Sequence, residues 1–538
     1  MQLALLASLL SVGGVYANQL RLARHVQSRG VPDAARGFEI HTIDMPINHF
    51  PSSSRYAPDP NTTFKQRYVF DSTYYKPGGP VFLYIGGETS VESRFSNLAS
   101  GIIKVLMSRT NGLGVILENR YYGESFPFAT TSTDELRFLT NEQTIADNAY
   151  FAQHAQFPGV NSTSINAPQT PWILYGGSLA GAQTAFSLKQ YGGDDGVLWG
   201  GIASSATTKA SHTYAEWYDQ YQRYGPQDCI GYLNGIVSTI DKVFDYGSAA
   251  DIREMKSLFG LEALTDHRDF AMTIAFPLGG PDSYPTATWQ ELNWVPGHSS
   301  NQIFNFCSNI TNDEAPESIR SVDLALSKYT NGEPLPGLGN YADYIRKHIV
   351  PLCKSGEIGS SACFGTQNAT YWANTENGDD RSYLYTTCTE SGLYQVANTD
   401  GPSLVANVLQ ADYTQQWCNW AFPEGEYNSI PSKPDISQWN DYGGYSVEAD
   451  RLAHIDGEQD VWVNVCYHSP HAPKRRTTNA RDAFLNPHYL ITGAGHHWDS
   501  YALPNLEDEP QFIREAHKWE IRVVKRWLAD FAKRKHIS

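Results

Sequence analysis

The segment PWILYGGSLAGAQTAF, residues 171–186, decides the fold. Residues 172–175 form a short apolar run typical of a buried strand, and residues 179–190 have helical periodicity. Only the turn GGS, which ends in Ser178, separates the two. This is the context of a nucleophile elbow, a turn that admits only small neighbours and lifts a serine hydroxyl off the edge of a sheet. The usual second glycine of G-x-S-x-G is Ala180 here, and alanine is small enough to keep the turn.

The alternation of strand and helix continues on both sides of this segment. Residues 141–156 have helical periodicity. Further strands are expected at residues 81–85, 114–117, 197–203, 451–455 and 488–492. Strands that are apolar throughout and alternate with helices indicate a parallel sheet covered on both faces. Together with the elbow, this pattern predicts an α/β fold, with an α/β-hydrolase core.

A serine nucleophile of this kind needs a histidine base and an orienting carboxylate. In hydrolases they follow the serine in the order Asp or Glu, then His. One loop after an expected strand contains Asp456 and Asp460, and the loop after the next contains His496 and His497. Both loops should emerge at the sheet edge that carries Ser178. We favour Ser178, Asp460 and His496 as a catalytic triad, with Asp456 and His497 as open competitors.

The same edge should supply donors for a negative charge on a reacting carbonyl oxygen. The backbone N–H of Leu179, at the start of the helix, points to where such an oxyanion would form. By analogy with the loop after the third strand of hydrolases, a second donor is expected from Gly87 or Glu88. The sequence implies no metal site and no organic cofactor.

A long insertion divides the expected core. Strand signals are scarce at residues 207–434, where aromatic residues and cysteines are frequent and residues 240–264 look helical. We expect a hydrolase core made of residues 18–206 and 435–538. A large, mainly helical cap at residues 207–434 would be inserted between the nucleophile and the acid. Apolar residues recur at helical spacing near the C-terminus, which predicts a last helix with one face on the core.

Composition limits the class of protein and its partners. The chain has 538 residues, of which 41% are hydrophobic and 13% aromatic, so it is not a disordered chain. A formal net charge of −17 argues against nucleic acid and against an anionic membrane surface as partners. Beyond the N-terminal segment, no apolar run is long enough to span a bilayer.

The N-terminus predicts secretion. Residues 3–15 form a short apolar run that ends in a small-residue cleavage site, so residues 1–17 have the pattern of a signal peptide. Candidate N-glycosylation sequons begin at Asn61, Asn161, Asn309 and Asn368. We expect an extracellular protein, and an acidic compartment of the lysosomal or vacuolar kind stays open.

The chain has seven cysteines, none in a C-x-x-C spacing, so neither a zinc site nor a thioredoxin-type pair is indicated. In an oxidising compartment most of them should pair. The pairing we favour is Cys229–Cys307, Cys353–Cys363 and Cys388–Cys418, with Cys466 left over. Other connectivities stay open.

Several short motifs are spread over nearly the whole mature chain. They are FKQRY at 64–68, GPV at 79–81 leading to GGE at 86–88, RYYGES at 120–125, GGS at 176–178, TCTE at 387–390, DGEQDVW at 456–462 and HHWD at 496–499. In this combination the chain resembles the serine carboxypeptidase S28 family. That family includes lysosomal Pro-X carboxypeptidase, dipeptidyl peptidase II and secreted fungal prolyl endopeptidases.

The resemblance implies roles for the residues chosen above. The family's nucleophile is the serine of GGS, its acid is the last aspartate of N-G-x-x-D-P-W and its base is the first histidine of the HH pair. Matched by motif, these are Ser178, Asp460 and His496. This chain departs from the usual residues at three positions, with Asp456 for Asn, Val461 for Pro and Leu179 for Tyr.

The resemblance also implies a secreted serine peptidase that cleaves on the carboxyl side of proline, with a helical cap that selects peptides. Trp462 and Trp498 each lie two residues past an expected triad member, so both should flank the triad. The resemblance places Trp462 at an apolar pocket for the rigid proline ring.

Proline-containing peptides or proteins are then the partners. Endopeptidase, carboxypeptidase and dipeptidyl peptidase modes all stay open. So do an ester hydrolase on the same fold and a catalytically inactive binding ectodomain.

Overall fold

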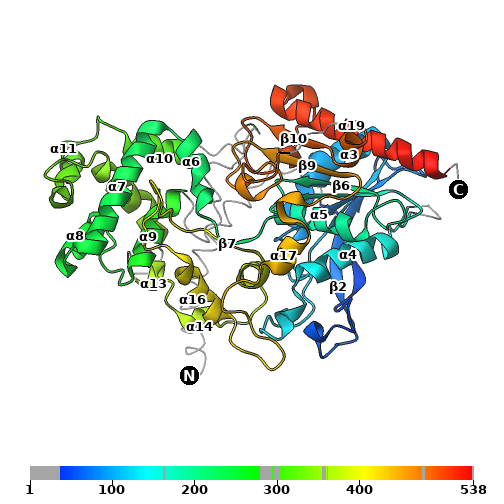
Figure 1. The fold of residues 1–538 in the computed structure, drawn as a ribbon, viewed down its shortest axis with the longest axis horizontal. Helices are drawn as coiled ribbons and strands as arrows, with labels where there is room; N and C mark the ends of the chain where they lie inside the picture. The colour runs from blue at the N-terminus through cyan, green and yellow to red at the C-terminus, as the bar shows by residue number, and fades with distance from the viewer. Residues whose placement is uncertain are drawn as a thin grey trace, which may run out of the picture.

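The computed structural model describes residues 37–160, 165–278, 294, 302–353, 359, 361–474 and 479–535. Its centre is an eight-stranded sheet with the order β1-β2-β4-β3-β5-β6-β9-β10 (Figure 1). The strands are His41–Pro46 (β1), Thr63–Asp71 (β2), Val81–Ile85 (β3), Leu113–Leu117 (β4), Trp172–Gly177 (β5), Gly200–Ser204 (β6), Leu452–Gly457 (β9) and His488–Ile491 (β10).

The directions of the strands identify the fold. β1 and β2 pair antiparallel, as do β2 and β4. All the other pairings of the sheet, from β4 through β3, β5, β6 and β9 to β10, are parallel. This order and this mixture of directions are those of an α/β-hydrolase core, which confirms the predicted fold class.

Helices cover both faces of the sheet, which explains why its central strands are apolar throughout. Asn141–His154 (α4) and Leu179–Tyr191 (α5) pack together on one face. Ile102–Thr110 (α3) and the long C-terminal helix Gln511–Lys535 (α19) pack on the other. Because β3, β5, β6, β9 and β10 run parallel, their carboxyl ends meet at one edge, and the loops that carry the expected site residues start there.

Between β6 and β9 the chain is mainly helical. The helices are Asp219–Tyr224 (α6), Gln227–Tyr246 (α7), Ala249–Leu258 (α8), His267–Ala275 (α9), Gln302–Ile310 (α10), Glu317–Arg320 (α11), Leu338–Tyr344 (α12), Ser361–Phe364 (α13), Ala369–Trp372 (α14), Asp379–Thr386 (α15), Ala411–Ala421 (α16) and Ser437–Asp441 (α17). Among the described residues of this stretch, the only strands are the short pair Ser211–Thr213 (β7) and Gly392–Tyr394 (β8).

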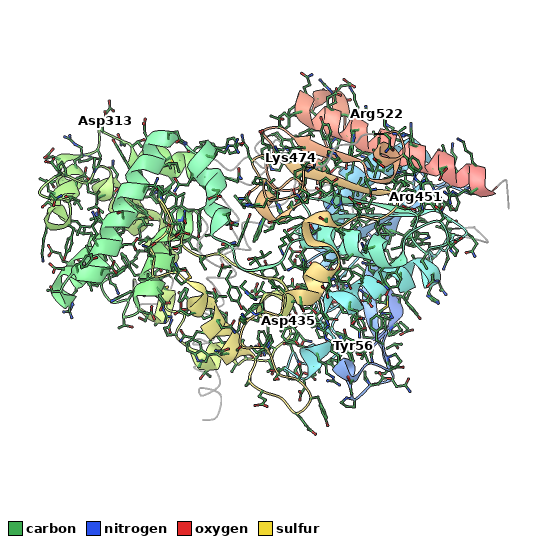
Figure 2. The ribbon with its side chains drawn as sticks, viewed as in Figure 1. Tyr56, Asp313, Asp435, Arg451, Lys474 and Arg522 are labelled. Atoms are coloured by element: carbon green, nitrogen blue, oxygen red, sulfur yellow. A yellow bond between two sulfur atoms is a disulfide. The ribbon has the colours of Figure 1, made fainter. Side chains whose placement is uncertain are left out.

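The first half of this insertion forms a separate helical body beside the sheet (Figure 1). Figure 2 shows Asp313 at its outer end and Arg522, on α19, far away on the core. The second half returns to the core, where Glu390 accepts a hydrogen bond from the backbone N–H of Asn141 at 2.8 Å. Its other carboxylate oxygen accepts from Arg55 at 2.7 Å. We call residues 207–434 the cap; these limits remain our proposal.

Three disulfides lie in the insertion. They join Cys229 to Cys307, Cys353 to Cys363 and Cys388 to Cys418, the pairs favoured from the sequence. Cys466 is free and buried. The first bridge ties α7 to α10 inside the helical body, and the third ties the turn that follows α15 to α16 against the core.

Three of the four sequons fall on described residues. Asn61 and Asn309 are exposed, and Asn368 is half-buried at the start of α14. Asn161 lies outside the described residues, as does the expected signal peptide at residues 1–17. Within the part of the chain that the structure describes, we find no helix with the length and apolar character of a membrane span.

Candidate active site

Ser178 sits in a strained turn between β5 and α5. Its backbone has φ 61° and ψ −126°, a region that non-glycine residues rarely occupy. Its N–H donates to the carbonyl oxygen of Ser204 on β6 at 2.9 Å, which helps to hold this conformation. The side chain lies at the carboxyl end of β5, and the residue is 8% exposed. This is the geometry of a nucleophile elbow.

The small neighbours of Ser178 are required by close backbone approaches. A Cβ on Gly176 would lie 2.1 Å from the carbonyl oxygen of Ala180, and one on Gly181 would lie 2.7 Å from that of Ser204. The absence of a side chain at Gly181 therefore allows α5 to pack closely against β6. Ala180, in the position where the glycine pattern is broken, is buried and its methyl group is accommodated.

Asp460 and His496 meet at the same sheet edge. Asp460, in the loop after β9, is fully buried, and His496, in the loop after β10, is 8% exposed. His496 Nδ1 lies 2.8 Å from Asp460 Oδ2. The other oxygen, Oδ1, accepts from the backbone N–H of Trp462 at 2.9 Å. A carboxylate so placed favours the tautomer that is protonated at Nδ1 and leaves Nε2 as an acceptor.

His496 Nε2 is buried and has no hydrogen-bond partner among the described residues. A buried polar atom of this kind is normally satisfied. An unpaired basic nitrogen at the sheet edge that carries Ser178 is what a general base offers to a nucleophile.

The two competing residues have other contacts. Asp456 Oδ2 accepts from His468 at 2.7 Å. His497 donates its backbone N–H to Ser205 Oγ at 2.9 Å. The ring of His497 packs against the elbow, since a Cβ on Gly177 would lie 3.0 Å from its Cγ. Burial, and then the nearby charges of His496 and Arg94, hold the pKa of His497 well below its usual value, so its ring stays neutral. These contacts favour Asp460 and His496 over both competitors.

The loops that carry Asp460 and His496 are joined directly. The N–H groups of Glu458 and Gln459 donate to the carbonyl oxygens of Ile491 and Ala494 at 3.0 and 2.9 Å. The two chains cross so closely that a Cβ on Gly457 would lie 2.2 Å from the carbonyl oxygen of Gly495. Glycine at this position of the DGEQD motif is therefore a requirement of the crossing.

The loop after β3 lies beside the elbow. Gly87 has φ 72°, and a Cβ on it would lie 3.6 Å from the Ala180 methyl group. Gly86 is held at both its polar atoms, because its N–H donates to the carbonyl of Leu117 and its carbonyl accepts from Arg94 Nε. The expected oxyanion donors Leu179 and Gly87 thus come from adjoining turns.

Glu118 anchors this loop and was missed by the sequence analysis. Its carboxylate is fully buried and accepts from the N–H of Val91 at 2.7 Å, from Ser125 Oγ at 2.7 Å and from the N–H of Glu124 at 3.0 Å. Burial raises the pKa of Glu118, and these hydrogen bonds oppose the rise. The signal in the sequence is a charged residue immediately after a fully apolar strand.

Asp499 plays a similar part under the His496 loop. Its carboxylate accepts hydrogen bonds from Tyr175 on β5 and, at 2.7 Å, from Ser204 on β6. It thereby ties the loop to the two strands that position Ser178. The sequence showed Asp499 only as part of the HHWD motif.

The two tryptophans expected beside the triad lie in different places. Trp462 packs in the cap cluster, where its ring stacks on Tyr214 with centroids 5.3 Å apart and lies 6.5 Å from the ring of His496. Trp498 packs in the core cluster of α3 and α19, with Phe512 as a neighbour. Trp498 therefore braces the core, and only Trp462 remains in our proposal for a substrate pocket.

Known proteins resemble this chain over most of its length. A family model described as "Serine carboxypeptidase S28" matches residues 52–516. The "Probable extracellular serine carboxypeptidase" of Arthroderma benhamiae is 36% identical over 533 residues, which cover 95% of this chain and 71% of that protein.

Relatives with lower sequence identity also align over most of this chain and of their own length. The serine protease vicPb of Bipolaris victoriae is 28% identical over 488 residues, 87% of this chain and 86% of that protein. The thymus-specific serine protease of Mus musculus is 24% identical over 513 residues, 91% of this chain and 88% of that protein. The family model includes the elbow and both loops described above, and the chain therefore belongs to the serine carboxypeptidase S28 family, a family of serine peptidases.

Proposed function

We propose that this protein is a secreted serine peptidase that cleaves peptides on the carboxyl side of proline, with Ser178, His496 and Asp460 as its triad. The observation that carries the triad is the buried Asp460–His496 hydrogen bond, which leaves Nε2 of the histidine without a partner among the described residues. The S28 family is a peptidase family, so peptides are the substrate class; the preference for proline rests on the motif resemblance.

The chemistry follows from these positions. His496 Nε2 takes the proton of Ser178 Oγ as the oxygen attacks the scissile carbonyl carbon. Asp460 stabilises the imidazolium that forms. The N–H of Leu179, with one from Gly87 or Glu88, binds the oxyanion. His496 then gives the proton to the leaving amine, and a water molecule activated by the same histidine hydrolyses the acyl-enzyme.

Proline specificity needs an apolar surface that accepts a rigid ring with no N–H to donate. Trp462 is suited to form it, since its indole lies between Tyr214 and His496. Tyr214 also fixes the backbone of this loop, because its hydroxyl donates to the carbonyl of Val461 at 2.6 Å. In this proposal the cap supports the pocket through Tyr214.

The location of the protein is part of the proposal. The apolar N-terminus, the three disulfides and the resemblance to the "Probable extracellular serine carboxypeptidase" of Arthroderma benhamiae support secretion. N-terminal sequencing of protein purified from culture medium should find a start near Asn18.

The specificity is tested with matched peptides that have proline or alanine before the scissile bond. We expect kcat/KM to favour proline by about 10- to 200-fold, the range for a well-fitted apolar group. Trp462→Phe should narrow that ratio, while Trp498→Phe, the matched tryptophan in the core, should leave it unchanged. Equal rates on both peptides for the wild type would refute prolyl specificity and leave the serine peptidase standing.

A further inference from the structure

Three polar side chains are linked by hydrogen bonds at the base of the loop that carries Asp460. Asp456, on β9, accepts at Oδ2 from the backbone N–H of His468 at 3.0 Å and has the ring Nδ1 of His468 at 2.7 Å. The other ring nitrogen, Nε2, lies 3.0 Å from Nδ1 of His488, the first residue of β10. We name Asp456, His468 and His488 the clasp.

The clasp joins the two segments that the proposed mechanism has to keep aligned. The segment 457–467, which carries Asp460, lies between Asp456 on β9 and His468. β10, which begins at His488, leads into the loop with His496. Near the triad, the two loops are already joined by backbone hydrogen bonds. The clasp closes the other end, so the Asp460 loop is held at both ends.

Two members of the clasp are shielded from water, and the third, His488, is half-buried. The side chain of Asp456 is fully buried, and that of His468 is 13% exposed. Asp456 Oδ1 has no partner among the described residues, so the carboxylate is satisfied through its contact with His468 alone. Unlike a surface ion pair, a buried carboxylate cannot exchange its partner for water at small cost.

Other titratable groups face the clasp. The ring of Tyr467 stacks on His454 with centroids 4.1 Å apart and lies 5.3 Å from the ring of His488. Burial, and then the charges of Asp456 and Asp460, raise the pKa of Cys466, so this thiol stays neutral. The described residues offer no set of three His, Cys, Asp or Glu side chains arranged to hold a metal ion.

We propose that Asp456, His468 and His488 are positioning residues, which hold Asp460 in register with His496 and make that alignment sensitive to protonation. The proposal rests on the proposed function, because it takes Asp460 and His496 as acid and base of the triad. None of the three side chains needs to touch the substrate.

Counting protons gives the direction of the pH effect. His468 donates Nδ1–H to Asp456, so its Nε2 accepts from His488 Nδ1–H when both rings are neutral. If either ring gains a proton, one N–H still faces one lone pair and the bond holds. If both rings are protonated, two N–H groups face each other and the bond is lost. Acid therefore opens the clasp only when both rings carry a second proton.

The variants separate these contacts. His468→Asn keeps a donor near Asp456 but removes the bridge to His488. His488→Asn keeps a side-chain group near the position of Nδ1 but cannot be protonated. His471→Asn is the matched control, since the side chain of His471 is 54% exposed and its nearest acidic partner is 3.9 Å away. Folding of each variant is checked by thermal midpoint before kinetics.

Three readouts distinguish positioning from stability: kcat and KM on a peptide substrate, the pH dependence of kcat, and the rate at which a fluorophosphonate labels Ser178. We expect His468→Asn to lower kcat and the labelling rate together by about 10- to 100-fold with little change in KM, as for a misplaced catalytic group. On the acid side, kcat of the wild type should fall more steeply than that of His488→Asn, in which only one ring of the clasp can gain a proton.

The two proposals can fail separately. A wild type that is neither labelled nor active on peptides would overturn the proposed function, and the role of the clasp with it. A wild type that is labelled and active, beside clasp variants with its kcat and acid slope, would overturn the clasp alone. If His468→Asn does not fold, the slope of His488→Asn decides.

Discussion

A buried carboxyl group on α19 should stabilise the folded protein more in acid than at neutral pH. Glu520 is fully buried, and neither of its carboxyl oxygens has a hydrogen-bond partner among the described residues. Burial, and then the charges of Asp499 and Glu509, raise the pKa of Glu520 well above its usual value. The pKa of Asp499 is raised as well, mainly by burial. Asp499 belongs to the loop that carries His496.

The sign of the effect follows from the proton balance. A carboxyl group whose pKa is raised in the folded state binds its proton more tightly there than in the unfolded chain. Its stabilising effect is complete below the unfolded pKa of about 4.3 and is lost as the pH rises towards the folded pKa. Within that window the free energy of unfolding falls by about 1.4 kcal/mol per pH unit for one such proton.

Glu520→Gln should remove this slope, because an amide of nearly the same shape stays neutral at every pH. The assay is the thermal midpoint of wild type and variant from pH 4.5 to pH 7.5. We expect the wild type to lose stability relative to Glu520→Gln at each step upwards. Glu515→Gln, on an exposed part of the same helix, is the control and should run parallel to the wild type. Parallel curves for wild type and Glu520→Gln would refute the reasoning.

Two further perturbations test the packing and the cap. Gly457→Ala should abolish activity and destabilise the fold, since its Cβ would lie 2.2 Å from a backbone oxygen. By contrast, Gly231 lies in the middle of α7, and a Cβ at this position would meet no atom within 4 Å. Gly231→Ala should therefore leave the free energy of unfolding unchanged or raise it by about 0.5–1 kcal/mol. Both are compared by circular dichroism and peptide hydrolysis, and an active Gly457→Ala would contradict the loop crossing. Thiol counting on denatured, unreduced protein should find one cysteine, Cys466, and reduction should lower the thermal midpoint because a native bridge contributes about 2–5 kcal/mol. A count of seven would refute the disulfides.

The parts of the fold that could be predicted are those whose signal is local. β3 and β5 are apolar throughout because both faces of the sheet are covered, and the turn before Ser178 is visible as small residues between a strand and a helix. Asp460 and His496 were found because each follows a parallel strand. Their hydrogen bond needed no information beyond the chain order and the common sheet edge.

The parts that could not be predicted depend on contacts between distant residues. β2 was missed because its sequence contains Gln66 and Arg67, which are polar yet buried. Both contact Glu118: the amide nitrogen of Gln66 donates to its backbone carbonyl, and Arg67 forms an ion pair with its carboxylate at 3.5 Å. Glu118 in turn was missed because its partners lie on separate loops.

The direction in which a side chain points could not be predicted either. Trp498 was expected beside the triad because of its spacing from His496. The intervening His497 has a left-handed backbone with φ 41°, and the chain then carries Trp498 into the core under α19. The spacing of residues in the sequence does not indicate this change of backbone direction at His497. Asp456 was seen only as a competitor for the acid, because its partner His468 lies twelve residues further along the chain.

The central claim is that Ser178 is a nucleophile activated by His496. It is tested most directly by treating the protein with a fluorophosphonate and locating the adduct by mass spectrometry of its peptides. The account predicts one adduct, on Ser178, in the wild type and none in folded Ser178→Ala. It also predicts slow labelling of His496→Ala, and loss of peptide hydrolysis on the order of 10⁴- to 10⁶-fold in both variants. An adduct on another serine, or wild-type hydrolysis by folded Ser178→Ala, would contradict it.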